Sequence, residues 1–129
     1  MIAPISGLNI SGAVFNQGYN NALGNARPSL YRQTFQAMIE DWRRAFRNDK
    51  MPFCIIGLTA GGEPQTYENF ELRTTDPAPY IREAQFLATK SLEFAEFLPA
   101  YDQQVPWYHP HKKFELGERA ARSVSYTHL

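Results

Sequence analysis

The sequence predicts an α/β fold in which helices cover both faces of a small parallel sheet. Three short apolar stretches alternate with three stretches of helical spacing, an order typical of right-handed crossovers between parallel strands. The middle stretch, MPFCIIGLTA, is apolar almost without interruption, as a strand covered on both faces should be. With 129 residues, of which 43% are hydrophobic, the chain has the length of one domain and enough apolar residues for a core.

The three strands are predicted at residues 12–16, 52–58 and 94–99. The first lies in SGAVFNQG and runs into the polar turn YNNALGNARP, as a buried strand followed by a surface loop does. The second follows a polar turn, and the third, which has the weakest pattern, leads to Asp102. A long loop at residues 61–79 is expected over the carboxyl edge of the sheet, where α/β proteins hold their ligands.

The three helices are predicted from apolar residues that recur at steps of three and four. The first follows Pro28, and its apolar side consists of Tyr31, Phe35, Met38, Ile39, Trp42, Ala45 and Phe46. The second covers residues 79–90 and has a proline in its first turn. The third covers residues 112–123, and its inward side is expected to consist of Phe114, Gly117, Ala120 and Ala121.

The composition argues against several classes of function. Thirteen basic and thirteen acidic side chains cancel without forming a block of like charge, so no nucleic-acid partner is expected. No apolar stretch approaches the roughly 20 residues that cross a bilayer, so we expect a soluble chain without a membrane partner. The single Cys54 excludes an intrachain disulfide and is expected to be a buried, inert thiol.

His109, in the stretch WYHPHKKF, is the first candidate for chemistry. It follows the third strand and precedes the last helix, which places it at the carboxyl edge of the predicted sheet. Pro110 restricts the residue before it to extended backbone, so the imidazole is presented from a stiff turn that suits a general base. The alternative is a histidine that caps the helix or packs beside Trp107 and Tyr108.

His109 and His111 also form an H-x-H pair, which is part of many metal sites. No cysteine lies nearby and no fixed third ligand is evident in the sequence. We therefore predict no metal site and expect His111 to be a solvated residue of the first helical turn.

The turn QGYNN at residues 17–21 is the second candidate for chemistry. Side-chain amides and backbone N–H groups just past the carboxyl end of a strand are donors suited to a developing oxyanion. An ordinary strand-to-helix turn is the alternative. In a parallel sheet this turn and His109 are expected to approach each other across the same edge.

Six stretches of the sequence together resemble one protein family. MIAP, GAVFNQGYNNA, YRQTFQAMIEDWRRAF, MPFCIIGL, IREAQ and YHPHKKFELGERAAR have the order and spacing found in sialate O-acetylesterase-like carbohydrate esterases of the SGNH-hydrolase superfamily. The resemblance covers most of residues 1–122. It implies that residues 1–124 are the C-terminal part of a flavodoxin-like, three-layer α/β/α domain, which is incomplete here.

The resemblance implies a serine hydrolase that removes acyl groups, typically acetyl, from sugars without a cofactor. Its expected partner is an O-acylated carbohydrate, and its expected location is extracellular or periplasmic. In the family, a QGE-(S/T)-N motif supplies oxyanion and substrate contacts, and a histidine before a proline is the catalytic base. The matching positions of this sequence are Gln17, Gly18, Asn20 or Asn21, and His109.

The sequence departs from the family pattern at three points. The nucleophilic serine belongs to a G-Q-S-N-like motif upstream of MIAP, and it has no equivalent among Ser6, Ser11, Ser29 and Ser91. The orienting acid of the family corresponds here to Pro106, so Asp102, the nearest upstream acid, is the candidate, with a solvated loop acid as the alternative. Tyr19 replaces the usual glutamate. A noncatalytic carbohydrate-binding or structural module with the same fold is therefore the alternative function.

Both ends of the chain suggest a fragment. The stretch SVSYTHL abandons the helical pattern, so residues 125–129 are expected to be a non-native or truncated tail. Without the preceding strands, the sheet edge is expected to carry unpaired backbone groups beside exposed residues, namely Val14, Phe15 or Ile55 and Ile56. The isolated chain is therefore expected to be catalytically silent and to aggregate or dimerise.

Overall fold

The computed structural model of the chain describes residues 2–23, 25–60, 66–73, 77–103 and 113–127. Its three strands are β1 (Ala13–Phe15), β2 (Phe53–Ile56) and β3 (Ala95–Leu98). They form one sheet in the order β1-β2-β3, and both pairs of neighbours are parallel. All three predicted strands are therefore confirmed.

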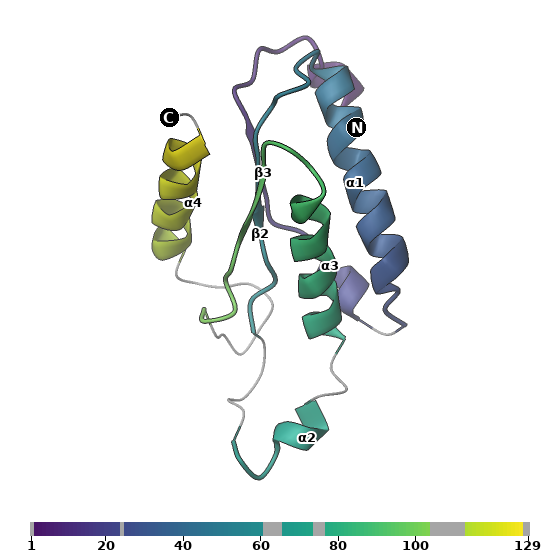
Figure 1. Ribbon diagram of the computed structural model, residues 1–129, viewed down its shortest axis with the longest axis vertical. Coiled ribbons are helices and arrows are strands. Elements are labelled where there is room, and N and C mark those ends of the chain that lie inside the picture. Colours follow the sequence, from purple (N-terminus) through teal and green to yellow (C-terminus); the bar gives the residue numbers. More distant parts are fainter. Residues whose placement is uncertain (1, 24, 61–65, 74–76, 104–112, 128–129) are drawn as a thin grey trace.

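The helices lie on both faces of this sheet. Helix α4 (Phe114–Thr127) covers one face, and α1 (Pro28–Ala45) and α3 (Ala78–Lys90) cover the other, as Figure 1 shows. The predicted fold class, α/β with a parallel sheet between helices, is confirmed as an incomplete three-layer arrangement.

The strand register decides which side chains each face presents. Val14 pairs with Cys54, which in turn pairs with Glu96, so these three side chains share one face. Cys54 and Ile56 pack against α4 on this face, whereas Phe53 points to the opposite face and joins the core under α1. All four residues of β2 are buried, because β2 is the central strand and has helices on both sides.

Helix α1 forms where the apolar spacing predicts it. It begins at Pro28. Proline has no backbone N–H, and at the first position of a helix this costs nothing, because an N–H there would have no partner within the helix. Its most deeply buried apolar residues are Phe35 and Ile39, and they pack in one core with Met51, Phe53, Ile55 and Ala88. Since Ala88 belongs to α3, this core fixes both helices to the same face of the sheet.

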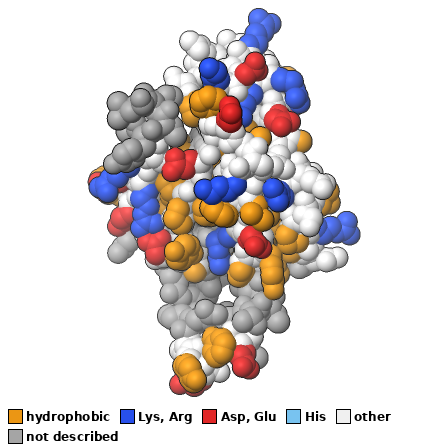
Figure 2. Space-filling view, in the orientation of Figure 1, with side chains coloured by type: hydrophobic (Ala, Val, Ile, Leu, Met, Phe, Trp, Pro, Cys, Tyr) orange, Lys and Arg blue, Asp and Glu red, His pale blue; other side chains and the backbone are white. Residues whose placement is uncertain are grey.

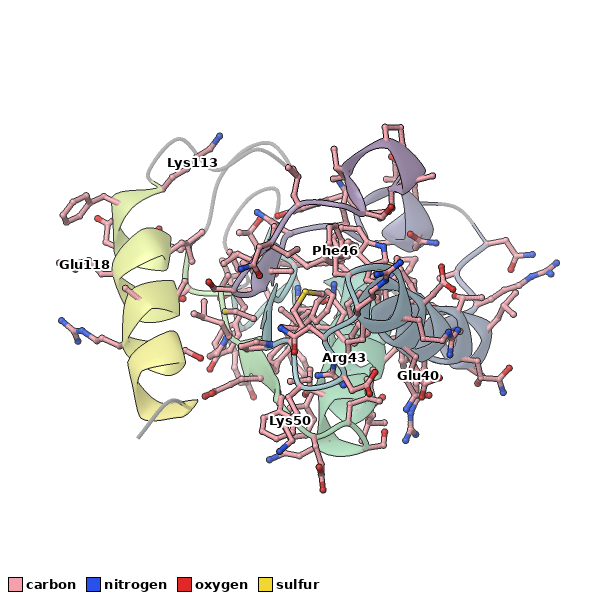
Figure 3. The ribbon with its side chains drawn as sticks, turned by 90° about the horizontal axis from the view of Figure 1, so that it is seen from above. Glu40, Arg43, Phe46, Lys50, Lys113 and Glu118 are labelled. Atoms are coloured by element: carbon pink, nitrogen blue, oxygen red, sulfur yellow. The ribbon has the colours of Figure 1, made fainter. Side chains whose placement is uncertain are left out.

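Arg43 of α1 is buried at the amino edge of the sheet. Its guanidinium donates hydrogen bonds to the carbonyl oxygens of Met51 at 3.1 Å, Glu93 at 2.7 Å and Phe94 at 3.1 Å, which lie just before β2 and β3. In the view from above in Figure 3, Arg43 lies in the interior, whereas Glu118 points outward from α4. Arg43 therefore joins α1 to the start of two strands, far from the carboxyl edge.

Helix α4 differs from its prediction at both its end and its buried side. It continues to Thr127 instead of ending at residue 123, because Ser, Tyr and Thr have only moderately low helix propensity. The prediction that Phe114 faces inward is wrong, since its side chain is 76% exposed and Leu116 is buried instead, whereas Ala120 is buried as predicted. The spacing of apolar residues predicts a helix but leaves two adjacent sides of it as candidates for the sheet contact.

The predicted long loop between residues 61 and 79 contains a short helix, α2 (Phe70–Arg73), beyond the lower edge of the sheet in Figure 1. The rings of Tyr67 and Phe70 lie 6.1 Å apart there. A helix of four residues is too short to leave a periodic signal in the sequence, so the prediction of an irregular loop missed it.

Strand β1 leaves an apolar groove beside α4. Val14 is 59% exposed, as predicted, but the prediction of exposed Ile55 and Ile56 is wrong, because the central strand β2 is covered on both faces. The groove has a volume of about 630 Å³ and is lined by Val14, Asn16, Ile56, Lys113, Leu116, Gly117, Ala120 and Ala121. Gly117 and Ala121, predicted to face inward, are exposed instead, because the side of α4 that carries them borders this open groove.

Charged side chains are dispersed over the surface. Figure 2 shows acidic and basic side chains mixed over one face of the molecule, with hydrophobic side chains gathered across its middle. That face therefore carries no broad patch of one sign. No helix in the described part of the chain has the length and apolarity needed to span a membrane.

Candidate active site

The carboxyl ends of the three parallel strands meet at the lower edge of the sheet in Figure 1. The turn at residues 17–21 follows β1, residues 57–60 follow β2, and Asp102 follows β3. Parallel α/β sheets bind their ligands at this edge. The structure therefore places the predicted turn and Asp102 at the edge where a site is expected.

Gly18 gives the turn after β1 its shape. Its φ of 129° lies in the region that side-chain-bearing residues rarely adopt. A Cβ atom at this position would lie 3.0 Å from the Tyr31 hydroxyl oxygen, 3.1 Å from Nε2 of Gln85 and 3.3 Å from Cδ2 of Leu58. Backbone conformation and available space therefore both require glycine here.

A short 3₁₀ helix, η2 (Asn20–Ala22), continues the turn. The Gly18 carbonyl accepts hydrogen bonds from the N–H groups of Asn21 at 3.0 Å and Ala22 at 3.1 Å. The exposed residues Asn20 and Asn21 line a pocket of about 370 Å³, together with Leu23, Asn25, Arg27, Leu30, Tyr31 and Thr34. The amides and the guanidinium of this pocket are donors suited to hydroxyl and carbonyl oxygens of a ligand.

Tyr19, which occupies the position of the family's glutamate, ties the turn to the end of β2. Its hydroxyl oxygen lies 3.2 Å from Oγ1 of Thr59, a residue that is only 3% exposed. Its half-buried side chain also packs against a cluster that contains Leu58 and Ile81. Tyr19 thus holds the turn through packing and a hydrogen bond between two hydroxyl groups, a task that needs no carboxylate.

Gln85 of α3 is a site residue that the sequence reasoning missed. It is fully buried, and its Nε2 donates to the Gln17 carbonyl at 2.7 Å and to the Tyr31 hydroxyl at 3.2 Å. Its Oε1 accepts the N–H of Leu58 at 3.3 Å. The feature of the sequence that could have revealed Gln85 is its place as a lone amide on the apolar side of α3, among Ile81, Ala84 and Ala88.

Tyr31 of α1 is a second hydrogen-bond donor to the Gln17 carbonyl. Its hydroxyl lies 3.4 Å from the Gln17 carbonyl oxygen and is oriented to donate to it. Burial raises the pKa of Tyr31, so the hydroxyl stays protonated over the pH range in which proteins normally work. The Gln17 carbonyl therefore accepts from two neutral donors on two different helices.

Asp102 is paired with Arg119 of α4. Nη1 of Arg119 donates to Oδ1 at 2.7 Å, and Nη2 donates to Oδ2. The hydrogen bonds from Arg119 hold the pKa of Asp102 below its ordinary value, so this carboxyl group is ionised at neutral pH. Nη1 also donates to the carbonyl oxygen of Pro99 at 3.1 Å, so Arg119 fixes the segment that follows β3.

The predicted base, His109, belongs to residues 104–112, which lie outside the described part of the chain. Pro106, Trp107, Tyr108 and His111 lie in the same segment. The approach of the His109 imidazole to Gln17 stays a prediction. Within the described residues, no group of three His, Cys, Asp or Glu side chains is placed to hold a metal ion.

Cys54 is buried in β2 under α4, as the sequence predicts. Burial raises the pKa of its thiol, and this effect outweighs the hydrogen bond with Ser123, which acts in the opposite direction. Because the thiolate is the reactive form of cysteine, Cys54 is a poor nucleophile in this setting.

The chain is similar to known esterases in sequence and in fold. Sialate O-acetylesterases of Pongo abelii and Homo sapiens are each 34% identical to it over 67 residues, which is 46% of this chain and 12% of each relative. The chain thus matches only a small part of the length of these curated relatives. No family model matches it.

Among solved structures, a carbohydrate acetylesterase from Xanthomonas citri matches 98% of this chain and 28% of its own chain, with a TM-score of 0.79 and 28% sequence identity. Nearly the whole of the present chain therefore has the same fold as the matching part of that acetylesterase. These matches in sequence and structure confirm the resemblance of the chain to sialate O-acetylesterase-like carbohydrate esterases of the SGNH type.

Proposed function

We propose that this chain forms part of a serine carbohydrate esterase that removes O-acyl groups, typically acetyl, from sugars. The observation that carries the proposal is the similarity of 98% of the chain to a carbohydrate acetylesterase at 28% identity. In this proposal the nucleophilic serine comes from polypeptide upstream of these residues. An extracellular or periplasmic location belongs to the same proposal, because the family resemblance implies it.

The proposed reaction uses His109 as general base and then as general acid. His109 takes the proton of the serine hydroxyl while the serine oxygen attacks the carbonyl carbon of the ester. The intermediate carries a negative charge on the former carbonyl oxygen. When the bond to the sugar oxygen breaks, His109 returns the proton to that oxygen, and water then hydrolyses the acyl-enzyme by the same two proton transfers. These steps need no cofactor.

The turn after β1 is proposed to stabilise the oxyanion and to hold the substrate. Its donors are the Gly18 backbone N–H and the side-chain amides of Gln17, Asn20 and Asn21. The exposure of these three side chains at the carboxyl edge, and the pocket beside Asn20 and Asn21, support this role. Donors held in place before the reaction stabilise charge without a further cost of reorganisation.

Asp102 is proposed to orient His109. The lowered pKa of Asp102 keeps it ionised, and its two oxygens offer about four acceptor positions. The two N–H groups of Arg119 occupy two of them, and the Asp102 backbone N–H and the Gln103 side chain are further donors to this carboxylate. In the proposal the imidazole N–H takes the place of one of these two further donors. Arg119 would then fix the carboxylate, and the carboxylate would fix the base.

The test is ester hydrolysis by the polypeptide expressed together with its upstream coding sequence. We expect serine-inhibitor-sensitive turnover of p-nitrophenyl acetate and of O-acetylated sugars. His109→Ala should lower kcat by about 10²- to 10⁴-fold, the usual contribution of a general base, whereas the matched control His111→Ala should leave kcat nearly unchanged. Turnover that survives His109→Ala contradicts the proposed mechanism.

A noncatalytic carbohydrate-binding module with the same fold is the second candidate. It is favoured by Tyr19, whose hydroxyl is bound to Thr59 at a position where the family has a glutamate. Such a module should bind sugars without any turnover. Isothermal titration with O-acetylated and deacetylated sugars, run beside the hydrolysis assay, separates the two functions.

A further inference from the structure

We propose that Gln85 is a positioning residue that aims the Gly18 N–H at the developing oxyanion. The inference deepens the proposed esterase function and rests on it. Gln85 itself touches no substrate in this proposal, because its side chain is fully buried. It acts through the peptide bond between Gln17 and Gly18.

The hydrogen bonds of Gln85 join three separate parts of the carboxyl edge. Nε2 donates to the Gln17 carbonyl at 2.7 Å and to the Tyr31 hydroxyl at 3.2 Å, and Oε1 accepts the Leu58 N–H at 3.3 Å. Both amide hydrogens and the amide oxygen of Gln85 are thus used. A fully satisfied buried amide has one orientation, so it fixes the groups around it.

The orientation of the Gly18 N–H follows from the geometry of the peptide bond. The Gln17–Gly18 peptide is trans, and in a trans peptide the C=O and the N–H point in opposite directions. Since Gln85 and Tyr31 draw the Gln17 carbonyl inward, the Gly18 N–H points away from both of them. Within the described residues this N–H donates to no acceptor.

The remaining bonds of the turn keep this peptide in place. The Gly18 carbonyl accepts the N–H groups of Asn21 and Ala22, which fixes the peptide that follows. The φ of 129° at Gly18 and the closeness of Gln85, Tyr31 and Leu58 leave the turn little freedom to rearrange. An N–H that is held in place and has no acceptor among the described residues is the kind of donor that an oxyanion hole uses.

The experiment compares two substitutions of Gln85 in the full polypeptide. Gln85→Met keeps much of the length and shape of the side chain without its hydrogen bonds, and Gln85→Glu replaces the donor Nε2 by an oxygen that faces the Gln17 carbonyl. Each should lower kcat by about 10- to 100-fold with a nearly unchanged KM, because a misaimed donor costs less than the 10²- to 10³-fold loss caused by a deleted one. The kcat values are normalised to the folded fraction measured by circular dichroism.

Gln36→Met is the matched control. Gln36 of α1 donates to Oγ of Ser91 at 2.6 Å, so this substitution also removes a glutamine hydrogen bond between two segments, but outside the candidate site. It should leave kcat unchanged even where it lowers the melting temperature. Unchanged kcat in both Gln85 variants overturns the inference, and so does an equal loss of kcat in Gln36→Met.

A measurement on the wild-type protein covers the case in which the Gln85 variants do not fold. In ¹⁵N-labelled protein, the Gly18 amide resonance should shift strongly when a serine-directed phosphonate forms its tetrahedral adduct, whereas the Leu58 amide should shift little. A Gly18 amide that does not respond overturns the inference while the esterase function stands. If wild-type protein shows no turnover and no adduct, the esterase function fails and this inference fails with it.

Discussion

Arg119 of α4 donates one N–H to each carboxylate oxygen of Asp102, the acid that follows β3. Through Nη1, Arg119 also binds the Pro99 carbonyl at 3.1 Å. The pair therefore links the only described helix on its face of the sheet to the segment that leads toward His109. We expect the ionisation of Asp102 to affect the stability of the protein and, in the proposed mechanism, its catalysis.

The Asp102 pair should make stability depend on pH at the acid end. Hydrogen bonds from Arg119 lower the pKa of Asp102 in the folded state, so its contribution to stability is complete above the unfolded-state pKa of about 3.9. The contribution is lost as the pH falls through the lower folded-state pKa. Urea denaturation should therefore show Asp102→Asn to be less stable than wild type at pH 7 and equal to it near pH 2. A difference that persists at low pH contradicts the role of this ion pair.

Substitutions in the Asp102–Arg119 pair can distinguish two roles of Asp102, the proposed orientation of the base His109 and the structural support of the loop. Asp102→Asn and Arg119→Gln both break the ion pair, but only the first removes the carboxylate proposed to face His109. We expect Asp102→Asn to lower kcat of the full polypeptide far more than Arg119→Gln, because an amide cannot stabilise the imidazolium. Steady-state kinetics at pH 8 measures both. Equal losses in the two variants would mean that the pair only supports the loop.

Cys54 should be unreactive in the folded protein. It is 3% exposed, so a reagent can hardly reach it, and burial raises the pKa of its thiol, so only a small fraction is present as thiolate. Labelling with 5,5′-dithiobis(2-nitrobenzoic acid) at pH 8 should release no thionitrobenzoate until urea is added, and one equivalent afterwards. Cys54→Ala serves as the blank. Rapid labelling without denaturant would show that α4 does not cover β2 in solution.

Gly18→Ala should destabilise the protein and abolish the turn geometry. The substitution forces a Cβ into a φ of 129° and against Tyr31, Gln85 and Leu58, at a cost of about 1–3 kcal/mol in the free energy of unfolding. Gly7→Ala is the control, since a Cβ at Gly7 meets nothing within 4 Å, and it should change stability by less than about 0.5 kcal/mol. Thermal unfolding of the two variants beside wild type provides the comparison. Equal stability of Gly18→Ala and wild type contradicts the tight turn.

The sequence pattern predicted the strands and long helices well because their burial is regular. The uninterrupted apolar residues of β2 and the spacing of Phe35 and Ile39 in α1 follow directly from contact with the core. The exposed Phe114 was assigned to the wrong side of α4, because neighbouring sides of this helix both carry small or apolar residues. Which of them meets the sheet depends on tertiary packing that a local pattern does not contain.

The candidate site was predicted less completely than the fold. The QGYNN turn was recognised because a glycine and side-chain amides directly after a strand indicate hydrogen-bond donors for an oxyanion. The structure places this turn at the carboxyl edge. Gln85 was missed, since a single glutamine on a helix is usually solvated and only its partners 68 and 54 residues away reveal its role. The Arg119 partner of Asp102 was missed for the same reason of distance along the chain.

The 129-residue chain expressed alone should be catalytically silent. In the proposed esterase the nucleophile lies upstream of these residues, and a serine hydrolase site without its nucleophile keeps only oxyanion and binding contributions, which have little effect on a substrate that is not positioned. Turnover of p-nitrophenyl acetate by the isolated chain should therefore equal that of its His109→Ala variant. Hydrolysis that depends on His109 in the isolated chain would show that the site is complete within these residues.

The isolated chain should also associate through the edge strand β1. Val14 is 59% exposed beside the apolar groove, and β1 pairs with β2 alone in the described sheet, so its other edge offers free backbone groups. Val14→Lys places a charge beside that edge and should shift the mass measured by light scattering toward the monomer. Leu8→Lys is the matched control, because Leu8 is also 59% exposed but lies outside the strands, and it should leave the mass unchanged. A wild-type chain that is monomeric at all concentrations contradicts association through this edge.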